Sequence, residues 1–242
     1  MKCLITVPGD ADALHSSVIT GNLLLQVGDY LHLCSRDDGR IDLVWRLQEG
    51  YEKAKADGFD VIAYLHSDVE IYEAGWLDRC LKEFEDPEVG VVGFGGALRL
   101  GHPDLYKVPY GLEQLARFDY RSNTTDALAH GTVEARECDV ATLDGFCLIV
   151  RVQLLDKMQG WPIDKLQFHN YDNALCCYAK RHGYRVRQVG VSCRHLGGGH
   201  SVKERWQQRC VQDFGMTDAE IHRKSHEWLY GEFRDVLPIS AT

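Results

Sequence analysis

Residues 60–70 form the stretch DVIAYLHSDVE, a short apolar run that ends in a histidine and two acids. The run at 60–65 has the length and composition of a buried strand. The polar side chains follow where this strand ends. In open parallel sheets, ligands bind beyond the carboxyl ends of the strands. The stretch therefore predicts both an element of an α/β fold and a site beside it.

The rest of the chain continues this pattern, because short apolar strands alternate with helical segments. Strands are predicted at 3–7, 30–34, 60–65, 89–94, 142–150 and 185–191, and helices at 11–26, 43–56, 76–84, 171–182 and 221–233. Such alternation predicts a parallel sheet with right-handed crossovers and helices on its faces. Thr217 and Glu220 form a capping-box pattern ahead of the last helix. Residues 101–140 are polar with little periodicity, which predicts a long loop of the kind that is often functional.

Composition narrows the class of protein. A length of 242 residues favours one large domain, or one domain with a tail. The net charge of −9 disfavours general affinity for nucleic acid or anionic membranes. The nine cysteines are an odd number and lie mostly in apolar runs, which favours reduced thiols over a disulfide framework. No apolar run is long enough for a membrane span, and the first residues resemble a strand more than a signal peptide. We therefore expect a soluble, cytoplasmic protein.

Asp68 and Glu70 are candidate ligands of a hard divalent cation. Carboxylates at a strand exit suit Mg²⁺ or Mn²⁺, which prefer oxygen ligands. The residues alone leave a simpler interpretation open, in which the strand becomes polar as it reaches solvent.

A second candidate site is the segment CRHLGGGH at 193–200. His195 follows another predicted strand, and the three glycines would allow backbone N–H groups to approach a phosphate. Two alternatives stay open: a flexible linker, and a zinc site formed by Cys193, His195 and His200. The spacing of that zinc site matches no familiar finger or ribbon.

A third candidate lies in the segment FHNYDN at 168–173, just before a predicted helix. Asp172 or Asn170 could cap the helix. Alternatively, Asp172 faces a cleft and takes a proton from an acceptor hydroxyl.

Taken together, four segments in this order resemble the family 2 glycosyltransferases of the GT-A fold. They are VIAYLHSD at 61–68, GWLDRCLKEFEDPEVGVVGFGGA at 75–97, LDGFCLIVRVQLLDKMQGW at 143–161 and NYDNALCCYAKRHGYRVRQVGVSCRH at 170–195. LHSDV at 65–69 is similar to a subgroup with His-x-Asp-Val in place of Asp-x-Asp. The resemblance implies a Rossmann-like, mostly parallel sheet. It covers about 1–200, with a donor half at 1–97, an acceptor half at 98–200, and a helical extension at 201–242.

The resemblance also implies roles for individual residues. The ligands of Mn²⁺ or Mg²⁺ would be Asp68, Glu70 and His195. The donor, with a UDP-sugar favoured, would be bound by Pro8, Asp37, Asp38, His66 and Asp68. The general base would be Asp172, and the acceptor side would be lined by Asp144, Gly145 and Trp161. Tyr171 and Ala174 depart from the family pattern beside the base.

The implied activity is a metal-dependent, inverting transfer of a sugar from a nucleotide-sugar to an acceptor hydroxyl. The acceptor is a glycan, a protein or a hydroxymethylated DNA base, and the net acidity disfavours DNA. One alternative is a nucleotidyltransferase, although the acidic stretch PGDAD at 8–12 differs from a phosphate-binding loop. The other is a module of the same fold that binds a sugar or metal without catalysis. Basic and aromatic residues alternate along 106–121, which suits either stacking on sugars or bases, or packing of the segment onto the core.

Overall fold

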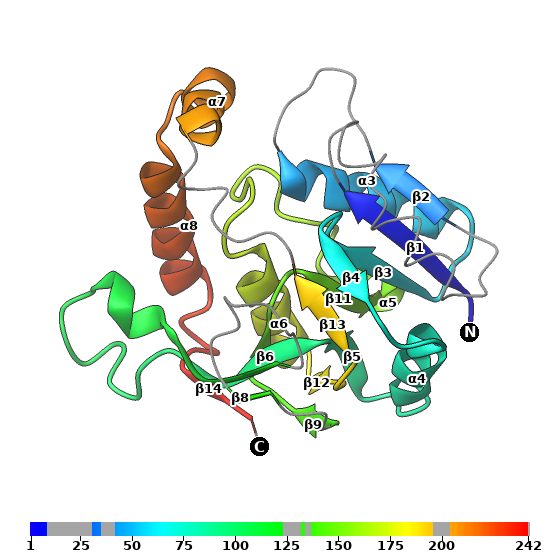
Figure 1. Ribbon diagram of the computed structural model, residues 1–242. Coiled ribbons are helices and arrows are strands. Elements are labelled where there is room, and N and C mark those ends of the chain that lie inside the picture. Colours follow the sequence, from blue (N-terminus) through cyan, green and yellow to red (C-terminus); the bar gives the residue numbers. More distant parts are fainter. Residues whose placement is uncertain (9–30, 35–41, 123–131, 134–136, 196–203, 242) are drawn as a thin grey trace.

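A computed structural model describes residues 1–8, 31–34, 42–122, 132–133, 137–195 and 204–241 (Figure 1). The helix predicted at 11–26 lies outside these residues, and so do Asp37, Asp38 and the glycine segment at 197–199. The predicted α/β architecture is confirmed.

A seven-stranded sheet forms the centre of the molecule. Its strands are β1 (Cys3–Pro8), β2 (Leu31–Cys34), β3 (Val61–Leu65), β5 (Val89–Gly93), β9 (Cys138–Asp139), β11 (Cys147–Arg151) and β12 (Arg185–Gln188). Their order is β2-β1-β3-β11-β5-β12-β9. Within the described residues, β11 and β9 run against the other five strands. The sheet is therefore mostly parallel, with one antiparallel strand in its middle.

Alternation of side chains along the strands gives the sheet two buried faces. On β3, Ile62 and Tyr64 join one hydrophobic core, whereas Val61, Ala63 and Leu65 join the other. Helices α3 (Leu43–Ala56), α5 (Val152–Lys157), α6 (Tyr171–Arg181) and α8 (Asp218–Glu232) contribute to the first core, and α4 (Trp76–Glu83) to the second. Helices therefore cover both faces, as the sequence predicts (Figure 1).

Two smaller sheets flank the central one. Their strands are β4 (Val69–Ile71), β6 (Gly95–Leu100), β7 (Arg117–Ser122), β8 (Thr132–Val133), β10 (Thr142–Leu143), β13 (Cys193–His195) and β14 (Ile239–Ser240). The first sheet has the order β10-β6-β7-β8, with β14 also paired to β6, and the second is β13-β4. The 3-10 helix η1 (Leu112–Leu115) and the helix α7 (Glu204–Phe214) complete the described elements.

Three of the predicted elements need correction. The loop predicted at 101–140 contains η1 and β7, because β6 offers an edge to which the polar segment pairs, with Arg99 opposite Phe118. The strand predicted at 142–150 is divided into β10 and β11, because a turn at 144–146 breaks it. The last predicted strand, β12, ends at Gln188, three residues early.

The C-terminal segment packs into the first core. Thr217 and Glu220 form the predicted capping box, with both reciprocal hydrogen bonds in place. Leu229 and Phe233 are fully buried in the same core as α3 and α6. Ile239 pairs with Leu100 of β6. Residues beyond 200 therefore complete the fold of the segment before them. Among the described residues, every helix is too short or too polar to serve as a membrane span.

Candidate active site

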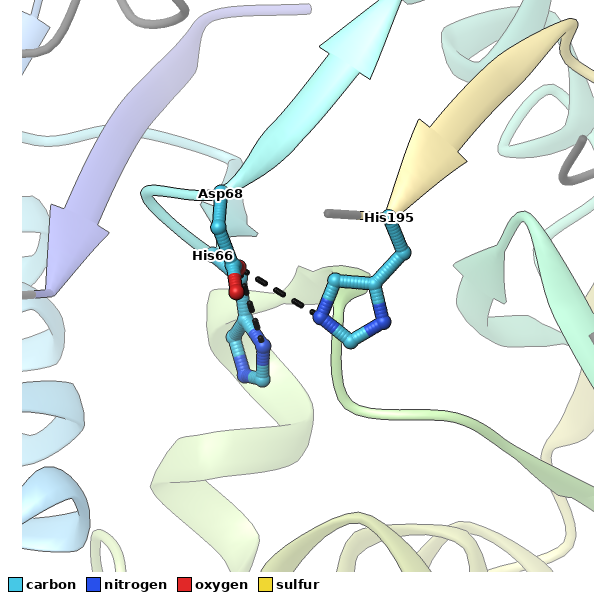
Figure 2. Close-up of side chains that lie close together, drawn as sticks. All are labelled: His66, Asp68 and His195. Atoms are coloured by element: carbon cyan, nitrogen blue, oxygen red, sulfur yellow. Dashed lines mark ion pairs between the residues drawn. The ribbon is translucent and has the colours of Figure 1, made fainter. Parts of the chain in front are cut away.

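Three potential metal ligands meet at the carboxyl end of β3. His66 follows the strand, and Asp68 lies in the turn that leads into β4. Because β13 pairs antiparallel to β4 with His195 opposite Val69, the register brings His195 beside Asp68. One ligand atom from each of the three residues lies within 4.8 Å of the others, so the group could hold a metal ion. Figure 2 shows both imidazoles pointing toward the carboxylate.

The carboxylate of Asp68 is the electrostatic centre of this group. Its Oδ1 lies 3.4 Å from Nε2 of His195 and 4.0 Å from Nδ1 of His66. Burial alone would raise the pKa of Asp68, but the hydrogen bond with His195 and the two imidazoles lower it to about 2. Burial lowers the pKa of His66. Asp68 is therefore ionised and His66 favours its neutral form, the states in which both groups bind metals.

Tyr171 fixes the orientation of His66. Its hydroxyl lies 2.7 Å from Nε2 of His66, which leaves Nδ1 on the side of Asp68. Burial raises the pKa of Tyr171 well above 10, so the hydroxyl stays protonated. Gly145 leaves room for this hydroxyl, because a Cβ there would lie 2.0 Å from it. The departure from the family pattern at Tyr171 thus provides an outer partner for a candidate ligand.

The other residues predicted for the donor and metal sides are not members of the three-residue group or lie outside the described residues. Glu70 is not in the three-residue group; its carboxylate accepts a hydrogen bond from the Tyr72 hydroxyl at 2.6 Å. Pro8 is buried at the carboxyl end of β1. Cys193 is buried in the second core, and His200 lies outside the described residues.

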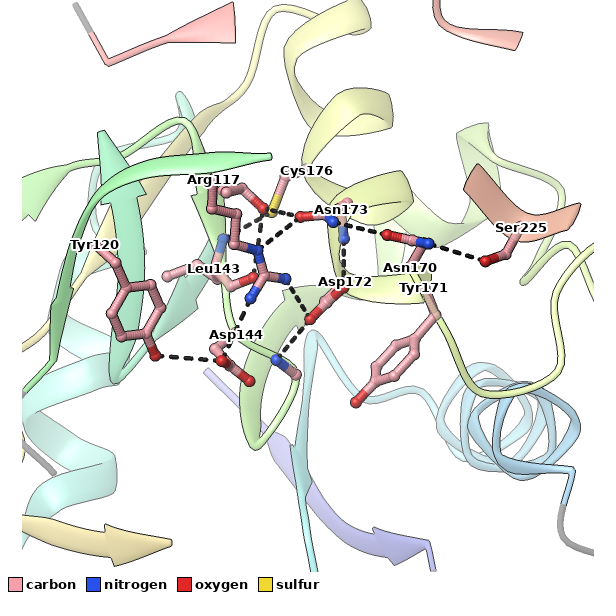
Figure 3. A network of polar contacts seen from close by, with 12 residues as sticks. Arg117, Tyr120, Leu143, Asp144, Asn170, Tyr171, Asp172, Asn173, Cys176 and Ser225 are labelled. Carbon is pink, nitrogen blue, oxygen red and sulfur yellow. Dashed lines mark hydrogen bonds and ion pairs between the residues drawn. The ribbon is translucent and has the colours of Figure 1, made fainter. Parts of the chain in front are cut away.

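Arg117 connects the two predicted acceptor-side carboxylates. Its guanidinium donates to Asp172 Oδ2 at 2.6 Å, to Asp144 Oδ2 at 3.3 Å and to Asn173 Oδ1 at 3.0 Å (Figure 3). The N–H of Gly145 also donates to Asp172 Oδ2, at 3.0 Å. The attraction of Asp172 and Asp144 raises the pKa of Arg117 despite its burial. The guanidinium therefore holds both carboxylates in fixed positions.

A pocket of about 430 Å³ joins the metal group to this network. It is lined by His66, Leu115, Ala116, Arg117, Asp144, Phe168, His169, Asn170, Tyr171, Asp172, Asn173, His222 and His226. Trp161 does not line it; the indole is buried and donates from Nε1 to the Tyr64 hydroxyl at 3.1 Å. Asn170 occupies the N-cap of α6 without a side-chain capping bond, and Asp172 lies in the first turn. The pocket thus adjoins two carboxylates and the candidate metal group.

Comparison with known proteins gives the family. Residues 45–227 match the model of a glycosyltransferase-like family, which is more than half of the chain. The chain belongs to this glycosyltransferase-like family. No curated protein matches it in sequence.

Three solved structures of other proteins have a fold similar to that of this glycosyltransferase-like protein. A mannosyltransferase from Pyrobaculum calidifontis in complex with GDP-Man and Mn²⁺ is 15% identical, with a TM-score of 0.52, over 98% of this chain and 70% of that one. The catalytic domain of Drosophila β1,4-galactosyltransferase 7 in complex with xylobiose is 15% identical, with a TM-score of 0.50, over 84% and 73%. GalNAc-T7 with UDP, GalNAc and Mn²⁺ is 9% identical, with a TM-score of 0.53, over 97% and 57%. At such identities the likeness establishes the GT-A type fold alone.

Two features of this glycosyltransferase-like protein were absent from the predicted site. Arg117 lies in the segment predicted as a loop, where only the alternation of charged and aromatic residues at 117–121 indicates a strand. His222 and His226 lie in the segment predicted as an extension, and only their spacing of four residues indicates a shared helix face.

Proposed function

We propose that this protein is a metal-dependent glycosyltransferase that moves a sugar from a nucleotide-sugar to an acceptor hydroxyl with inversion. The observation that carries the proposal is the meeting of His66, Asp68 and His195 at the exit of β3, beside a pocket that contains two carboxylates. The family supports the reaction class.

The donor set fits a transition metal. Two imidazoles with one carboxylate suit Mn²⁺ better than Mg²⁺, which prefers oxygen ligands alone. Two of the similar structures contain Mn²⁺ with GDP-Man or with UDP and GalNAc. A divalent cation at this position supplies positive charge against the negative charge of a departing nucleoside diphosphate.

The chain's own groups would perform the remaining tasks. Tyr171 orients His66, and Arg117 fixes Asp144 and Asp172 at the pocket. A carboxylate there takes the proton of the acceptor hydroxyl as that oxygen attacks the sugar from the face opposite the leaving group. A single displacement of this kind inverts the anomeric configuration.

A thermal-shift assay tests the donor site. We expect one of UDP-glucose, UDP-galactose, UDP-N-acetylglucosamine or GDP-mannose, with MnCl₂, to stabilise the protein. Ligand at 100 times its Kd adds about 2.7 kcal/mol, which raises the Tm of a chain of this size by several degrees.

Matched variants give the assay its control. Asp68→Asn should abolish the Mn²⁺-dependent shift, whereas Glu70→Gln should retain it, because Glu70 lies outside the metal group. If no nucleotide-sugar stabilises the protein with any divalent metal, the proposed function is wrong. Release of pyrophosphate in place of a nucleoside diphosphate would favour the nucleotidyltransferase alternative.

A further inference from the structure

The pocket extends away from the metal group to a wall of histidines. His66 lines one part of it, and His169, His222 and His226 line another. His169 precedes α6, whereas His222 and His226 are four residues apart on α8 and so share one helix face. We call these last three residues the histidine row. The donor chemistry proposed above uses none of them.

The rings of the histidine row contact one another in sequence. The ring centroids of His169 and His222 lie 4.9 Å apart, and those of His222 and His226 lie 5.0 Å apart. One end of the row is anchored, because Nε2 of His169 lies 3.0 Å from Asp218 Oδ1. The same oxygen accepts a hydrogen bond from the Trp206 indole at 2.9 Å. The row is therefore held in place by α7 and α8 together.

Burial favours the neutral form of two members of the row. It lowers the pKa of His222, and it lowers that of His226 to about 4. His226 is 7% exposed, and its Nδ1 has no hydrogen-bond partner among the described residues. A neutral imidazole offers one N–H donor and one acceptor nitrogen. A hydroxyl group, which also donates and accepts, matches this pair.

The charges of the pocket wall also favour an uncharged ligand. Among the described residues that line it, the side chains other than histidine that carry a formal charge are Arg117, Asp144 and Asp172. Arg117 pairs with both carboxylates, so the wall carries an excess of one negative charge. Apart from a cation held by the metal group, the described lining offers an anionic ligand no uncommitted cation to offset this excess.

We propose that this pocket binds the acceptor as a neutral, hydroxyl-rich sugar and that the histidine row selects hydroxyl groups over anionic groups. The assignment rests on the proposed function, because the acceptor must reach the carboxylates beside the metal group. Acceptors that place a phosphate or carboxylate in the pocket, such as sugar phosphates, are disfavoured by its charge.

Saturation-transfer NMR with a matched pair of sugars tests the proposal. The probes are methyl α-D-glucopyranoside and its uronate, together with the galactoside and mannoside pairs, in the presence of UDP and MnCl₂. We expect at least one neutral glycoside to bind, and its uronate to bind at least about tenfold more weakly. Equal or tighter binding of the uronate would overturn the proposal.

Variants on α8 assign the binding to the histidine row. His222→Leu should weaken the neutral glycoside about tenfold, and His222→Asn, which keeps a donor and an acceptor, should restore part of the affinity. His182→Leu is the control, because His182 is exposed at the end of α6 and does not line the pocket. If His222→Leu binds the neutral glycoside as tightly as the parent protein does, the histidine row has no role in binding. If His222→Leu misfolds, His222→Asn and the comparison of neutral and uronate probes on the parent protein still test the proposal.

Donor binding measured on the same samples separates this proposal from the proposed function. If a nucleotide-sugar stabilises the protein but no glycoside binds, only the pocket assignment is wrong. If glycosides bind and no nucleotide-sugar does, the proposed function is wrong and the neutral-sugar pocket stands. Competition between a glycoside and the sugar of the donor would place the donor in this pocket and overturn the acceptor assignment.

Discussion

Asp144 and Asp172 pair with one guanidinium but differ in how their oxygens are used. Asp172 accepts from Arg117 and Gly145 at Oδ2 and from the N–H of Asn173 at Oδ1, and its side chain is 12% exposed. Asp144 is 33% exposed and accepts at Oδ2, through two longer bonds from Arg117 and Tyr120. A general base needs a lone pair directed at the acceptor. From this geometry we propose Asp144 as the proton acceptor and Asp172 as the carboxylate that orders Arg117.

Isosteric amide variants distinguish these two roles. We expect Asp144→Asn to lower kcat by about 10²–10⁴-fold with little change in stability. Asp172→Asn should instead lower the free energy of unfolding by about 2 kcal/mol, because a buried charged hydrogen bond is lost. Steady-state kinetics and urea unfolding measure the two effects. The opposite pattern would make Asp172 the base, as the sequence predicts.

Gly145 is the residue on which the orientation of His66 depends. In Gly145→Ala the new methyl group would lie 2.0 Å from the Tyr171 hydroxyl, so the phenol must leave its place beside His66. Loss of such an outer partner lowers metal affinity by about 10–100-fold. We expect this loss in a Mn²⁺ titration of Gly145→Ala by calorimetry.

Tyr171→Phe is the matched variant for this prediction. It removes the hydrogen bond but keeps the ring, so it should weaken Mn²⁺ binding by a similar factor. In the double variant the two losses should not add, because both act on one contact. Additive losses of Mn²⁺ affinity would show that Gly145 affects the metal group by a contact other than that of Tyr171 with His66.

At the scale of elements, α8 docks onto the rest of the molecule through a face that contains an uncharged histidine. Ile221, His226 and Leu229 are buried on this helix. Burial lowers the pKa of His226 to about 4, below its value of about 6.5 in an unfolded chain. Between these two values the unfolded state binds more protons, so stability rises with pH and is lost as the pH falls.

This gives a prediction for acid sensitivity. From pH 7 to pH 5 we expect the parent protein to lose up to about 2 kcal/mol of unfolding free energy through His226. His222, whose pKa burial also lowers, adds to the loss in the same direction. His226→Gln should show a shallower pH dependence in urea unfolding. An identical slope in parent and variant would show that the ring is not held neutral.

Elements with strong periodicity could be predicted from the sequence, and polar ones could not. Helix α3 has the predicted bounds, 43–56, because apolar residues recur at helical spacing up to Asp57 and Gly58. Strand β7 was not predicted, because its residues RFDYRS pair with β6 through the backbone and bring little apolar signal of their own. Tyr106, in the segment thought to suit stacking on sugars or packing, packs against Tyr230 of α8 with ring centroids 4.7 Å apart.

At the scale of the whole molecule, the order of the motifs predicts which strand ends meet but not which side chains touch there. Asp68 and His195 were predicted as partners, and the pairing of β13 with β4 brings them together. The contact of His66 with Tyr171 spans 105 residues and has no local signal. The histidine row could not be predicted as a unit, because the spacing of His222 and His226 indicates only a shared helix face, and tertiary packing is what brings that face beside His169 and the pocket. The roles of individual residues in binding the donor and the acceptor stay predictions.

The antiparallel strand in the middle of the sheet has a consequence for the order of assembly. β11 lies between β3 and β5, and the N–H of His66 donates to the carbonyl of Phe146 just before it. Closing this register joins residues 82 to 90 positions apart in the chain, a slow event in folding because loop-closure entropy opposes it. A chain whose β1 and β3 have paired without β11 holds His66 and Asp68 but has no fixed Gly145 turn or Tyr171 beside them. We therefore expect the three-residue group to be complete only once the sheet has closed, so that an incompletely folded chain lacks the full site for a divalent cation.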